Sequence, residues 1–318
     1  MPERPLLLLL GRATPRIRER LASRFEVTQE KGARADEVVA VAAGMGAKVD
    51  AATIDALPAL KVIGNYGVGY DAVDAARAAK RGVIVTHTPN VLDDEVANTA
   101  IMLLLAADRR LVEFDAYVRG GRWEREGAAP LTRGLRGRTV GIVGLGRIGL
   151  AIADKLAGAF GATILYHSRS EKDAPYGYRD DLVAMAREAD ALVVVTPGGA
   201  ETHHLVSREV MEALGPDGTL VNVARGTVVD EAAMIDLLES GKLGRAGLDV
   251  FEAEPSVPEA LRALPNTVLL PHVGSATEET RAAMGDLMCA GIEDVIDGKR
   301  PQAPVPEARA LAQKLTAR

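Results

Sequence analysis

The chain has little cysteine and no excess of positive charge. Its 318 residues include a single cysteine, Cys289, which cannot form an intramolecular disulfide, and the 5 histidines offer it few partners for a metal site. The formal net charge of −6 argues against the extended basic face that nucleic-acid binding requires. We therefore expect a cytoplasmic protein without a nucleic-acid partner.

Long hydrophobic runs are missing as well. Leu6–Leu10 looks like a signal-peptide core, but this run between Pro5 and Gly11 is too short for a secretory or membrane segment. We expect a buried first strand and no membrane association. There is no internal repeat and no low-complexity tract apart from a polar, proline-containing tail after Gly298. The hydrophobic content of 47% is enough to fill two cores, which indicates a soluble two-domain α/β protein.

The N-terminal part of the chain alternates short apolar runs with helical patterns. This alternation indicates a parallel sheet covered on both faces, with ligands bound beyond the carboxyl ends of its strands. The glycine-rich loops Gly44–Gly46 and Asn65–Asp71 follow two of these ends. In the second loop Gly67 and Gly69 are expected to adopt conformations that other residues resist, which would bring backbone N–H groups to an anion. A sharp turn is the alternative. The expected strands are Leu6–Leu10, Val38–Ala42, Val62–Ile63 and Val83–Thr86, and the expected helices are Pro15–Ser23, Ala51–Ala56 and Asp71–Ala79.

A glycine pattern follows an apolar run in the middle of the chain. Gly144, Gly146 and Gly149 have the G-x-G-x-x-G spacing. They lie between an expected strand, Val140–Val143, and an expected helix, Ile148–Phe160. In such a pattern the first glycine allows a tight turn, the second lets backbone approach a pyrophosphate, and the third lets the helix lie against the strand. The free N–H groups and the dipole at the helix start also favour phosphate. We therefore predict a dinucleotide-binding unit rather than an ordinary strand–turn–helix corner.

The surrounding elements predict a complete domain around this motif. The expected strands are Ala162–His167, Leu192–Thr196, Thr219–Val223, Gly247–Val250 and Val268–Leu270, and the expected helices are Glu95–Asp108, Asp181–Glu188, Glu231–Ser240 and Thr277–Ile296. Because the motif lies far from the N-terminus, the predicted fold is a Rossmann-type dinucleotide domain, residues 99–285, inserted into a smaller flavodoxin-like α/β substrate domain, residues 1–98 and 286–318.

Three loops after the expected strands each present one ionisable residue, namely Arg225, Glu254 and His272. Residues that follow parallel strands converge on one rim of the sheet, so these side chains can meet beside a bound nicotinamide. Arg225 can bind a carboxylate and polarise the neighbouring carbonyl. His272 can protonate the developing alkoxide, and a carboxylate such as Glu254 favours the imidazolium form. Taken singly, the three also fit a solvated charge, a turn residue and a structural histidine.

The chain resembles the D-isomer-specific 2-hydroxyacid dehydrogenase family, and within it the glyoxylate/hydroxypyruvate reductase branch. The matching stretches span nearly the whole chain: Asn65–Asp71, Val143–Gly149, Val221–Asp230 (VNVARGTVVD), Gly247–Pro255 (GLDVFEAEP) and Pro271–Thr277 (PHVGSAT). The resemblance implies that Arg225, Glu254 and His272 are the catalytic residues. It also implies a homodimer built on the dinucleotide domain and no metal.

The same resemblance implies which residues bind ligands. Val68 and Gly69 would offer backbone N–H groups to the substrate carboxylate, with Arg225, while Met45, Tyr66 and Tyr70 would set the substrate tail. The residues expected at the cofactor are Thr99, Val223, Asp249, His272 and Gly274 near the nicotinamide, Gly144, Gly146, Arg147, Ile148 and Gly149 at the pyrophosphate, and Ser168, Arg169, Thr196 and Pro197 on the adenosine side.

Cofactor and substrate preferences are also expected. An NAD site usually has an acidic residue at the end of the second strand, where this chain has Ser168 and Arg169, which suit a 2′-phosphate. We expect NADP(H) to be preferred over NAD(H), and small 2-oxo acids (glyoxylate and hydroxypyruvate) to be reduced. Bulkier 2-oxo acids such as hydroxyphenylpyruvate or 2-ketogluconate stay open, as does a non-enzymatic, dinucleotide-sensing binding protein. Trp123 either anchors a dimer loop or lines the partner's pocket, and His203 and His204 are expected to face solvent.

Overall fold

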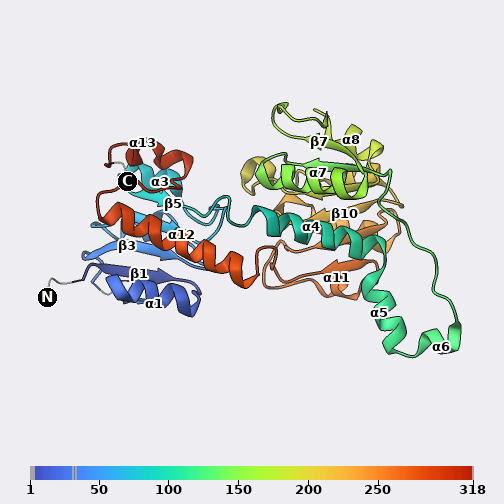
Figure 1. Cartoon of the computed structure of the whole chain (residues 1–318), viewed down its shortest axis with the longest axis horizontal. Coiled ribbons are helices and arrows are strands. Elements are labelled where there is room, and N and C mark those ends of the chain that lie inside the picture. The colour runs from blue at the N-terminus through green and yellow to red at the C-terminus, as the bar shows by residue number, and fades with distance from the viewer. Residues whose placement is uncertain (1–3, 31, 33, 317–318) are drawn as a thin grey trace. The chain divides into compact units, whose positions relative to one another are not determined.

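The computed structural model describes residues 4–30, 32 and 34–316, and it divides into two compact units (Figure 1). Unit 1 ends at Leu92 and resumes at Thr277, and unit 2 is Asp93–Ala276. Both boundaries lie earlier than those drawn from the sequence at 98/99 and 285/286. The reason is that the boundaries fall at the ends of helices. Asp93 begins helix α4 (Asp93–Asp108), and Thr277 caps helix α12 (Glu278–Ile296), so neither helix is divided.

Unit 1 is built on a parallel sheet of five described strands in the order β2-β1-β3-β4-β5. This is the strand order of flavodoxin-like folds, as predicted. All five leucines of β1 are buried, which explains the apolar run near the N-terminus without a membrane segment. The strands are β1 (Leu6–Leu10), β2 (Glu26–Thr28), β3 (Val38–Ala43), β4 (Val62–Asn65) and β5 (Ile84–Thr86).

Helix α12 packs on β3, β4 and β5, with α1 beside it (Figure 1). Small residues permit the close approach: a Cβ added at Gly64 would lie 2.7 Å from the Ile292 side chain, and one at Gly291 would lie 2.9 Å from Thr86. Thr277 accepts the Thr280 N–H and so begins the helix. The other unit 1 helices are α1 (Pro15–Arg24), α2 (Ala51–Asp55), α3 (Ala75–Lys80) and α13 (Arg309–Ala312).

Two details of unit 1 differ from the sequence-based expectation. Helix α3 begins at Ala75 rather than near Asp71, because Asp74 caps it by accepting the Arg77 N–H at 2.8 Å. The segment after Gly298 is not simply a polar tail. The N–H of Val305 donates to Val85 of β5, and Val305 itself is fully buried, so this segment covers the edge of the sheet.

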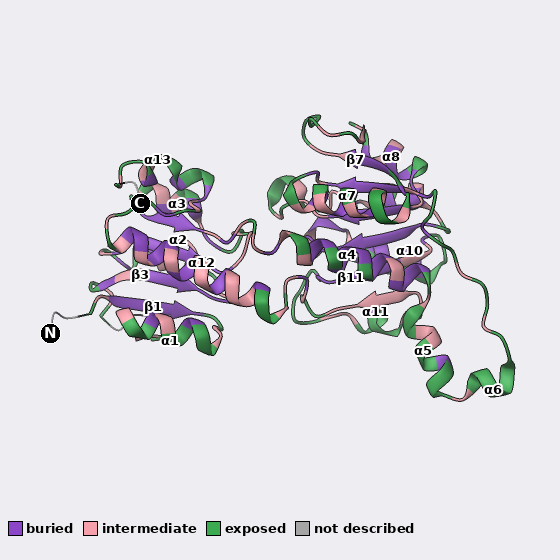
Figure 2. Cartoon of the chain, in the orientation of Figure 1, coloured by how far each residue is buried: buried purple, intermediate pink, exposed green. Residues whose placement is uncertain are grey.

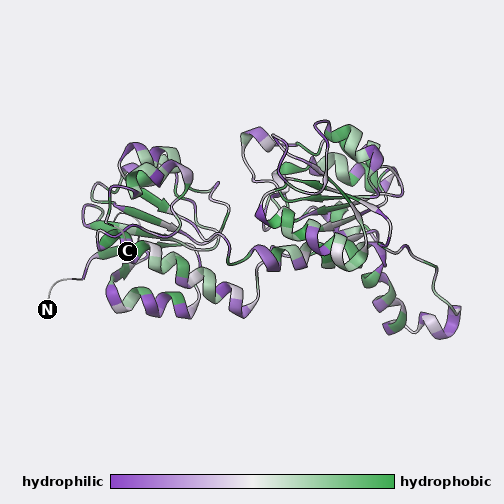
Figure 3. Ribbon diagram, turned by 45° about the horizontal axis from the view of Figure 1, so that its top comes forward, coloured by the Kyte–Doolittle hydropathy of each residue, from purple (hydrophilic) through white to green (hydrophobic). Residues whose placement is uncertain are grey.

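Unit 2 contains a parallel sheet of seven described strands in the order β12-β11-β10-β9-β6-β7-β8. The order reverses between β6 and β9, which is the switch point where doubly wound sheets bind ligands. Most strands are buried and apolar, as the purple arrows of Figure 2 and the green arrows of Figure 3 show. The strands are β6 (Thr139–Val143), β7 (Thr163–His167), β8 (Gly177–Tyr178), β9 (Ala191–Val194), β10 (Thr219–Asn222), β11 (Arg245–Leu248) and β12 (Thr267–Leu269).

Two groups of helices cover this sheet. Helix α4 packs against α7, and α9 packs against α8 and α10 (Figures 1 and 2). A buried ion pair fixes α4 to the sheet, since Asp108 accepts from Arg138 at 2.5 Å and from the Thr219 hydroxyl at 2.5 Å. None of the described helices combines enough length and hydrophobicity to cross a bilayer. The other helices are α5 (Leu111–Arg119), α6 (Arg122–Glu126), α7 (Arg147–Phe160), α8 (Leu182–Glu188), α9 (Arg208–Leu214), α10 (Glu231–Glu239) and α11 (Glu259–Ala263).

Candidate active site

The three glycines after β6 have three different environments. Gly144 has a φ of +104°, and its Cβ would lie 2.9 Å from the Thr196 backbone. A Cβ at Gly149 would lie 2.2 Å from the Gly144 carbonyl oxygen, so only glycine lets α7 start this close to the strand. At Gly146 no atom lies within 4 Å of a Cβ position. The first and third glycines therefore serve packing, while the second exposes backbone to any ligand.

Helix α7 begins differently from the helices on the other face of the sheet. Asp181, Ser207 and Asp230 cap α8, α9 and α10 with side-chain oxygens, whereas α7 begins at Gly146 with no side-chain cap. Its first N–H groups and its dipole are thus available to a phosphate. Arg147 lies at this end with its Nε 3.2 Å from Asp93 Oδ2. These residues fit the pyrophosphate of a dinucleotide, as predicted from their spacing.

A buried tyrosine fixes the loop after β7. The Tyr166 hydroxyl accepts the Lys172 N–H at 2.8 Å and donates to the Lys172 carbonyl at 3.2 Å. Ser168 donates to the Ser170 carbonyl at 2.6 Å, and Arg169 is 94% exposed, 3.7 Å from Glu201. The predicted 2′-phosphate residues therefore lie on an ordered loop, with the guanidinium of Arg169 accessible.

On the opposite side of the switch point, His272 and Glu254 form a close pair. His272 Nδ1 lies 2.8 Å from Glu254 Oε2. The His272 backbone has a φ of +55°, which non-glycine residues rarely adopt, and its N–H donates to the Asp249 carbonyl at 2.8 Å. Because the carboxylate engages Nδ1, the ring's Nε2 is the atom that can give a proton to a ligand.

The Glu254 carboxylate is ionised by its surroundings. Burial would raise its pKa, but the hydrogen bond and charge of His272, the Phe251 N–H at 3.0 Å and the charge of Arg225 together hold the pKa below its ordinary value. Glu254 therefore presents a negative charge to His272 Nδ1 in the neutral range.

Asp249 holds the backbone around His272. It is almost fully buried and accepts the N–H groups of Val273 at 2.7 Å and Gly274 at 2.8 Å, and burial raises the pKa of its carboxyl. The Thr99 hydroxyl donates to the Gly274 carbonyl at 3.2 Å. The structure thus brings together three of the residues expected near the nicotinamide, and Asp249 uses both oxygens to position the loop.

Arg225 lies on a turn that Asn222 fixes. Asn222 accepts the Ala224 N–H and donates to the Arg225 carbonyl, both at 3.0 Å. A Cβ at Gly226 would lie 1.9 Å from the Phe251 carbonyl carbon, so this turn lies directly against the segment that leads to Glu254. Arg225, Glu254 and His272, hereafter the rim triad, therefore share one rim of unit 2. Sequence reasoning missed Asn222, although a polar residue ending a buried strand was the available signal.

In unit 1, the segment Asn65–Gly69, hereafter the amide loop, presents backbone donors. Asn65 Nδ2 donates to the carbonyls of Gly67 at 3.1 Å and Gly69 at 3.0 Å, and the His87 ring lies 3.0 Å from the Val68 carbonyl. Among the described residues no hydrogen bond uses the N–H of Val68 or Gly69. The expectation of an unusual glycine conformation is wrong for Gly67, which has no positive φ. Asn65 and His87, which sequence reasoning missed, shape the loop instead.

The residues expected to set the substrate tail are partly engaged within unit 1. The Tyr66 hydroxyl donates to the Arg281 carbonyl at 2.9 Å, and the Tyr70 hydroxyl donates to Glu307 at 3.2 Å. The Met45 backbone pairs with Arg12. In Tyr66 and Tyr70, the ring rather than the hydroxyl is therefore the group left for a ligand.

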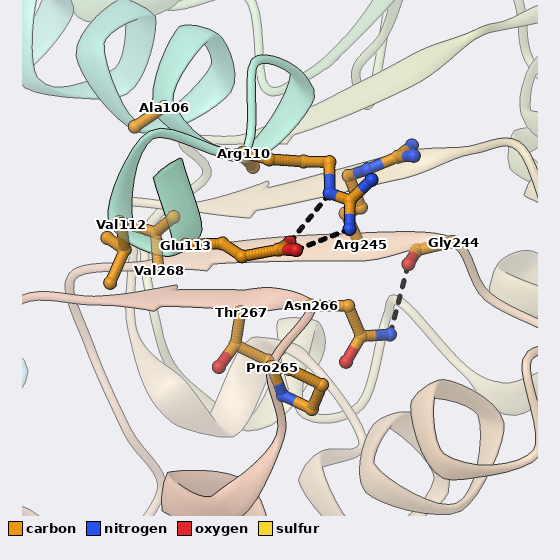
Figure 4. Close-up of a pocket in the computed structure, with 11 residues that line it drawn as sticks. Ala106, Arg110, Val112, Glu113, Gly244, Arg245, Pro265, Asn266, Thr267 and Val268 are labelled. Carbon is orange, nitrogen blue, oxygen red and sulfur yellow. Dashed lines mark hydrogen bonds and ion pairs between the residues drawn. The ribbon is translucent and has the colours of Figure 1, made fainter. Parts of the chain in front are cut away.

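A pocket of about 340 Å³ elsewhere in unit 2 contains none of the predicted site residues (Figure 4). It is lined by the end of α4, the start of α5 and the strands β11 and β12. Figure 4 shows Arg110 and Glu113 side by side at the start of α5, where Arg110 donates to Glu113 at 2.6 and 2.7 Å. This pair neutralises itself, and Arg245 is the other cationic side chain of the lining.

The strand order, the glycine loop and the uncapped α7 define a dinucleotide-binding α/β protein of the Rossmann type. Comparison with known proteins specifies the family. The family model for "D-isomer specific 2-hydroxyacid dehydrogenase, NAD binding domain" matches residues 101–274, which lie within unit 2. The chain therefore belongs to the D-isomer specific 2-hydroxyacid dehydrogenase family, oxidoreductases acting on the CH–OH group, and within it to the glyoxylate reductase branch.

Individual relatives agree with this assignment. The chain is 46% identical to an NADPH-dependent glyoxylate/hydroxypyruvate reductase of Sinorhizobium meliloti, solved with NADP and malonate, with a TM-score of 0.90 and 99% of each chain covered. It is 48% identical to glyoxylate/hydroxypyruvate reductase A HPR2 of Arabidopsis thaliana, over 85% of this chain and 86% of that protein. It is 49% identical to hydroxyphenylpyruvate reductase of Plectranthus scutellarioides, over 86% of this chain and 87% of that protein.

Proposed function

We propose that the protein is an NADPH-dependent reductase of small 2-oxo acids, with glyoxylate and hydroxypyruvate as its substrates. The observation that carries the proposal is the 2.8 Å pair of His272 and Glu254 on the rim that also bears Arg225. A 2-oxo acid offers a carboxylate and an adjacent carbonyl, and the rim triad contains one fixed cation and one proton donor that match these groups.

Each group of the chain would have a defined role. Arg225 binds the substrate carboxylate, and Val68 and Gly69 add backbone N–H donors to it. When bound, NADPH supplies a hydride to C2 of the oxo acid. His272 gives the proton on Nε2 to the carbonyl oxygen, so that the product is a 2-hydroxy acid, and Glu254 keeps the ring charged until that transfer. Unit 2 is then the dinucleotide domain and unit 1 the substrate domain.

The cofactor preference rests on the loop after β7. Arg169 presents an accessible guanidinium, and Ser168 stands at the position where an NAD site usually has an acidic residue. A relative with 46% identity was solved with NADP. We therefore propose that NADP(H) is preferred over NAD(H). We place the remaining predicted contacts, those of Thr196, Pro197, Ile148 and Val223, on the same dinucleotide.

A homodimer through unit 2 is also part of the proposal. Large apolar side chains are exposed along α4, α5, α6 and the segment before β6, and Leu131 at 98% and Trp123 at 62% are the most exposed of them. Such a patch is typical of a surface that another protein covers. A cytoplasmic location is proposed on the single, buried thiol of Cys289, whose pKa burial raises to about 12.

A panel of 2-oxo acids tests the function. NADPH oxidation would be followed with glyoxylate, hydroxypyruvate, hydroxyphenylpyruvate and 2-ketogluconate, and each series repeated with NADH. We expect the highest kcat/KM for glyoxylate or hydroxypyruvate with NADPH. A higher kcat/KM for a bulkier acid would move the substrate assignment to that acid. Dinucleotide binding without turnover on any member would indicate a binding protein, which membership of an oxidoreductase family already disfavours.

A further inference from the structure

Three side chains with metal-binding atoms meet in unit 2, outside the rim triad. His203 and His204 follow the short turn η1 (Ala200–Thr202), and Glu252 follows β11. One ligand atom from each lies within 4.8 Å of the other two. The expectation that both histidines face solvent does not account for this convergence. We propose that His203, His204 and Glu252 form a binding site for a divalent transition metal, with Zn²⁺ as its ion.

The spacing of the ligand atoms is close to that of a tetrahedral site. His204 Nε2 lies 3.4 Å from Glu252 Oε1. In zinc sites the ligand atoms lie about 2.0–2.2 Å from the metal, which places two tetrahedral ligands roughly 3.3–3.6 Å apart. The rings of His203 and His204 stack with centroids 4.0 Å apart and planes tilted by 28°, so the exposed His203 ring has to turn out of this stack to reach the same ion.

Both ligand-bearing loops are held by their backbones. The His204 N–H donates to the Thr227 carbonyl at 2.9 Å, and the Glu252 N–H donates to Glu231 Oε2 at 3.1 Å. Glu231 is itself buried, so this second contact fixes Glu252 from within the domain. A site whose ligands are placed before the ion arrives loses less conformational entropy on binding.

The ligand types select the ion. Two imidazoles and one carboxylate suit Zn²⁺, whereas Ca²⁺ and Mg²⁺ prefer oxygen alone. With three protein ligands, one coordination position would remain for water, and His204 and Glu252 are each about one-third exposed, which leaves that position accessible.

Occupancy would tie the loop after β9, which contacts the turn that follows Arg225, to the segment that carries Glu254. Thr227, which receives the His204 N–H, closely follows Arg225, and Glu252 closely precedes Glu254. A bound ion would therefore cross-link the loop after β9 to the loop after β11. This proposal does not depend on the identity of the substrate or cofactor.

A Co²⁺ titration of the chelator-treated protein tests the site, because tetrahedral Co²⁺ gives intense visible absorption bands. We expect saturation at one Co²⁺ per chain and displacement by Zn²⁺. His203→Asn and Glu252→Gln should each weaken binding by at least about tenfold, since even groups outside the ligand shell are worth that much. His167→Asn is the matched control, because His167 lies in the same unit and contacts the Arg179 carbonyl instead.

A second measurement guards against misfolded variants. Zn²⁺ should raise the Tm of the wild type and of His167→Asn, but not that of Glu252→Gln, whose Tm without metal should match the wild type. Three results would overturn the proposal: no saturable Co²⁺ binding, binding that His203→Asn and Glu252→Gln leave unchanged, or binding that disappears only in His272→Asn. The last result would place the ion on the His272–Glu254 pair.

Discussion

The rim triad of unit 2 and the amide loop of unit 1 present ligand-binding groups of opposite kinds. The rim triad consists of charged side chains, and the turn that carries Arg225 is fixed by the Asn222 side chain and by close packing at Gly226. The amide loop offers uncharged backbone donors, and the side chains of Asn65 and His87 contact its carbonyls. The charge therefore resides in one unit.

The two kinds of group suit different roles in the reaction. A titratable side chain can transfer a proton, whereas a backbone N–H can only donate a hydrogen bond to an anion. Substitutions in the rim triad should therefore affect kcat, and substitutions around the amide loop should affect KM. Six substitutions test this division and the cofactor loop, from the largest expected effect to the smallest.

Replacing the proton donor should have the largest effect. In His272→Asn we expect kcat for reduction to fall about 10²- to 10⁴-fold, the usual contribution of a general acid. Dinucleotide affinity, measured by fluorescence titration, should change little and serves as the control for folding. Turnover at the wild-type rate would remove His272 from the mechanism.

Replacing the fixed cation should have the next largest effect. Lys keeps the charge of Arg225 but loses the forked hydrogen-bonding geometry. We expect Arg225→Lys to lower kcat/KM for glyoxylate about 10- to 150-fold, which corresponds to a charge-assisted hydrogen bond of about 1.5–3 kcal/mol. A steady-state assay over a range of glyoxylate concentrations measures this change in kcat/KM. If the variant kept the wild-type kcat/KM, Arg225 would not bind the substrate carboxylate.

Cofactor selection can be tested independently of the rim triad. Arg169→Ala should raise KM for NADPH about tenfold or more and leave KM for NADH unchanged, because only the 2′-phosphate contact is lost. Tyr166→Phe should weaken NADPH binding through the same loop. The two effects should be less than additive in the double variant. Equal losses with NADPH and NADH would mean that the loop does not read the 2′-phosphate.

Glu254→Gln should change the pH dependence of the reduction rate more than it changes the maximal rate. The bond to His272 lowers the pKa of Glu254, so the wild-type carboxylate stays charged throughout the neutral range. With Gln at this position, the acid limb of the pH–rate profile that comes from protonation of Glu254 should be absent. A profile identical to that of the wild type would show that the pair does not support the proton donor.

The same carboxylate should contribute to folding stability with a defined sign. Because the folded-state pKa is lowered, the contribution is present above the ordinary value of about 4.3 and is lost as the pH falls through the lower folded value. Urea unfolding at a series of pH values should give a larger free energy of unfolding for the wild type than for Glu254→Gln at neutral pH. This difference should shrink as the pH falls. A difference that grew toward low pH would have the wrong sign.

The amide loop should give the smallest effect. Asn65→Ala removes two hydrogen bonds that hold the loop carbonyls, each worth about 0.5–1.5 kcal/mol. We expect KM for glyoxylate to rise roughly 2- to 10-fold with kcat nearly unchanged. A larger fall in kcat than in His272→Asn would contradict the division between the two units.

The sequence predicted the parts of this molecule that leave a periodic or ionisable signal. Most strands of both sheets, the glycine loop and the rim triad follow from apolar runs and from charged residues placed after them. By contrast, β2, β8 and α6 are short and largely polar or exposed, so no periodicity distinguished them from loops. Asn222 and Asn65 act through local side-chain bonds to backbone, which no periodic or charged pattern marks, and the boundary at Asp93 depends on how a whole helix packs.

Gly226 has a consequence for redesigning the enzyme. Any side chain at this position would push the Arg225 turn away from Phe251, because a Cβ would lie 1.9 Å from a main-chain carbon. Substrate range is therefore better altered through the Met45 side chain, which we propose sets the substrate tail, than through the residues flanking Arg225. Directed evolution that leaves Gly226 untouched should recover altered preferences without losing the reaction itself.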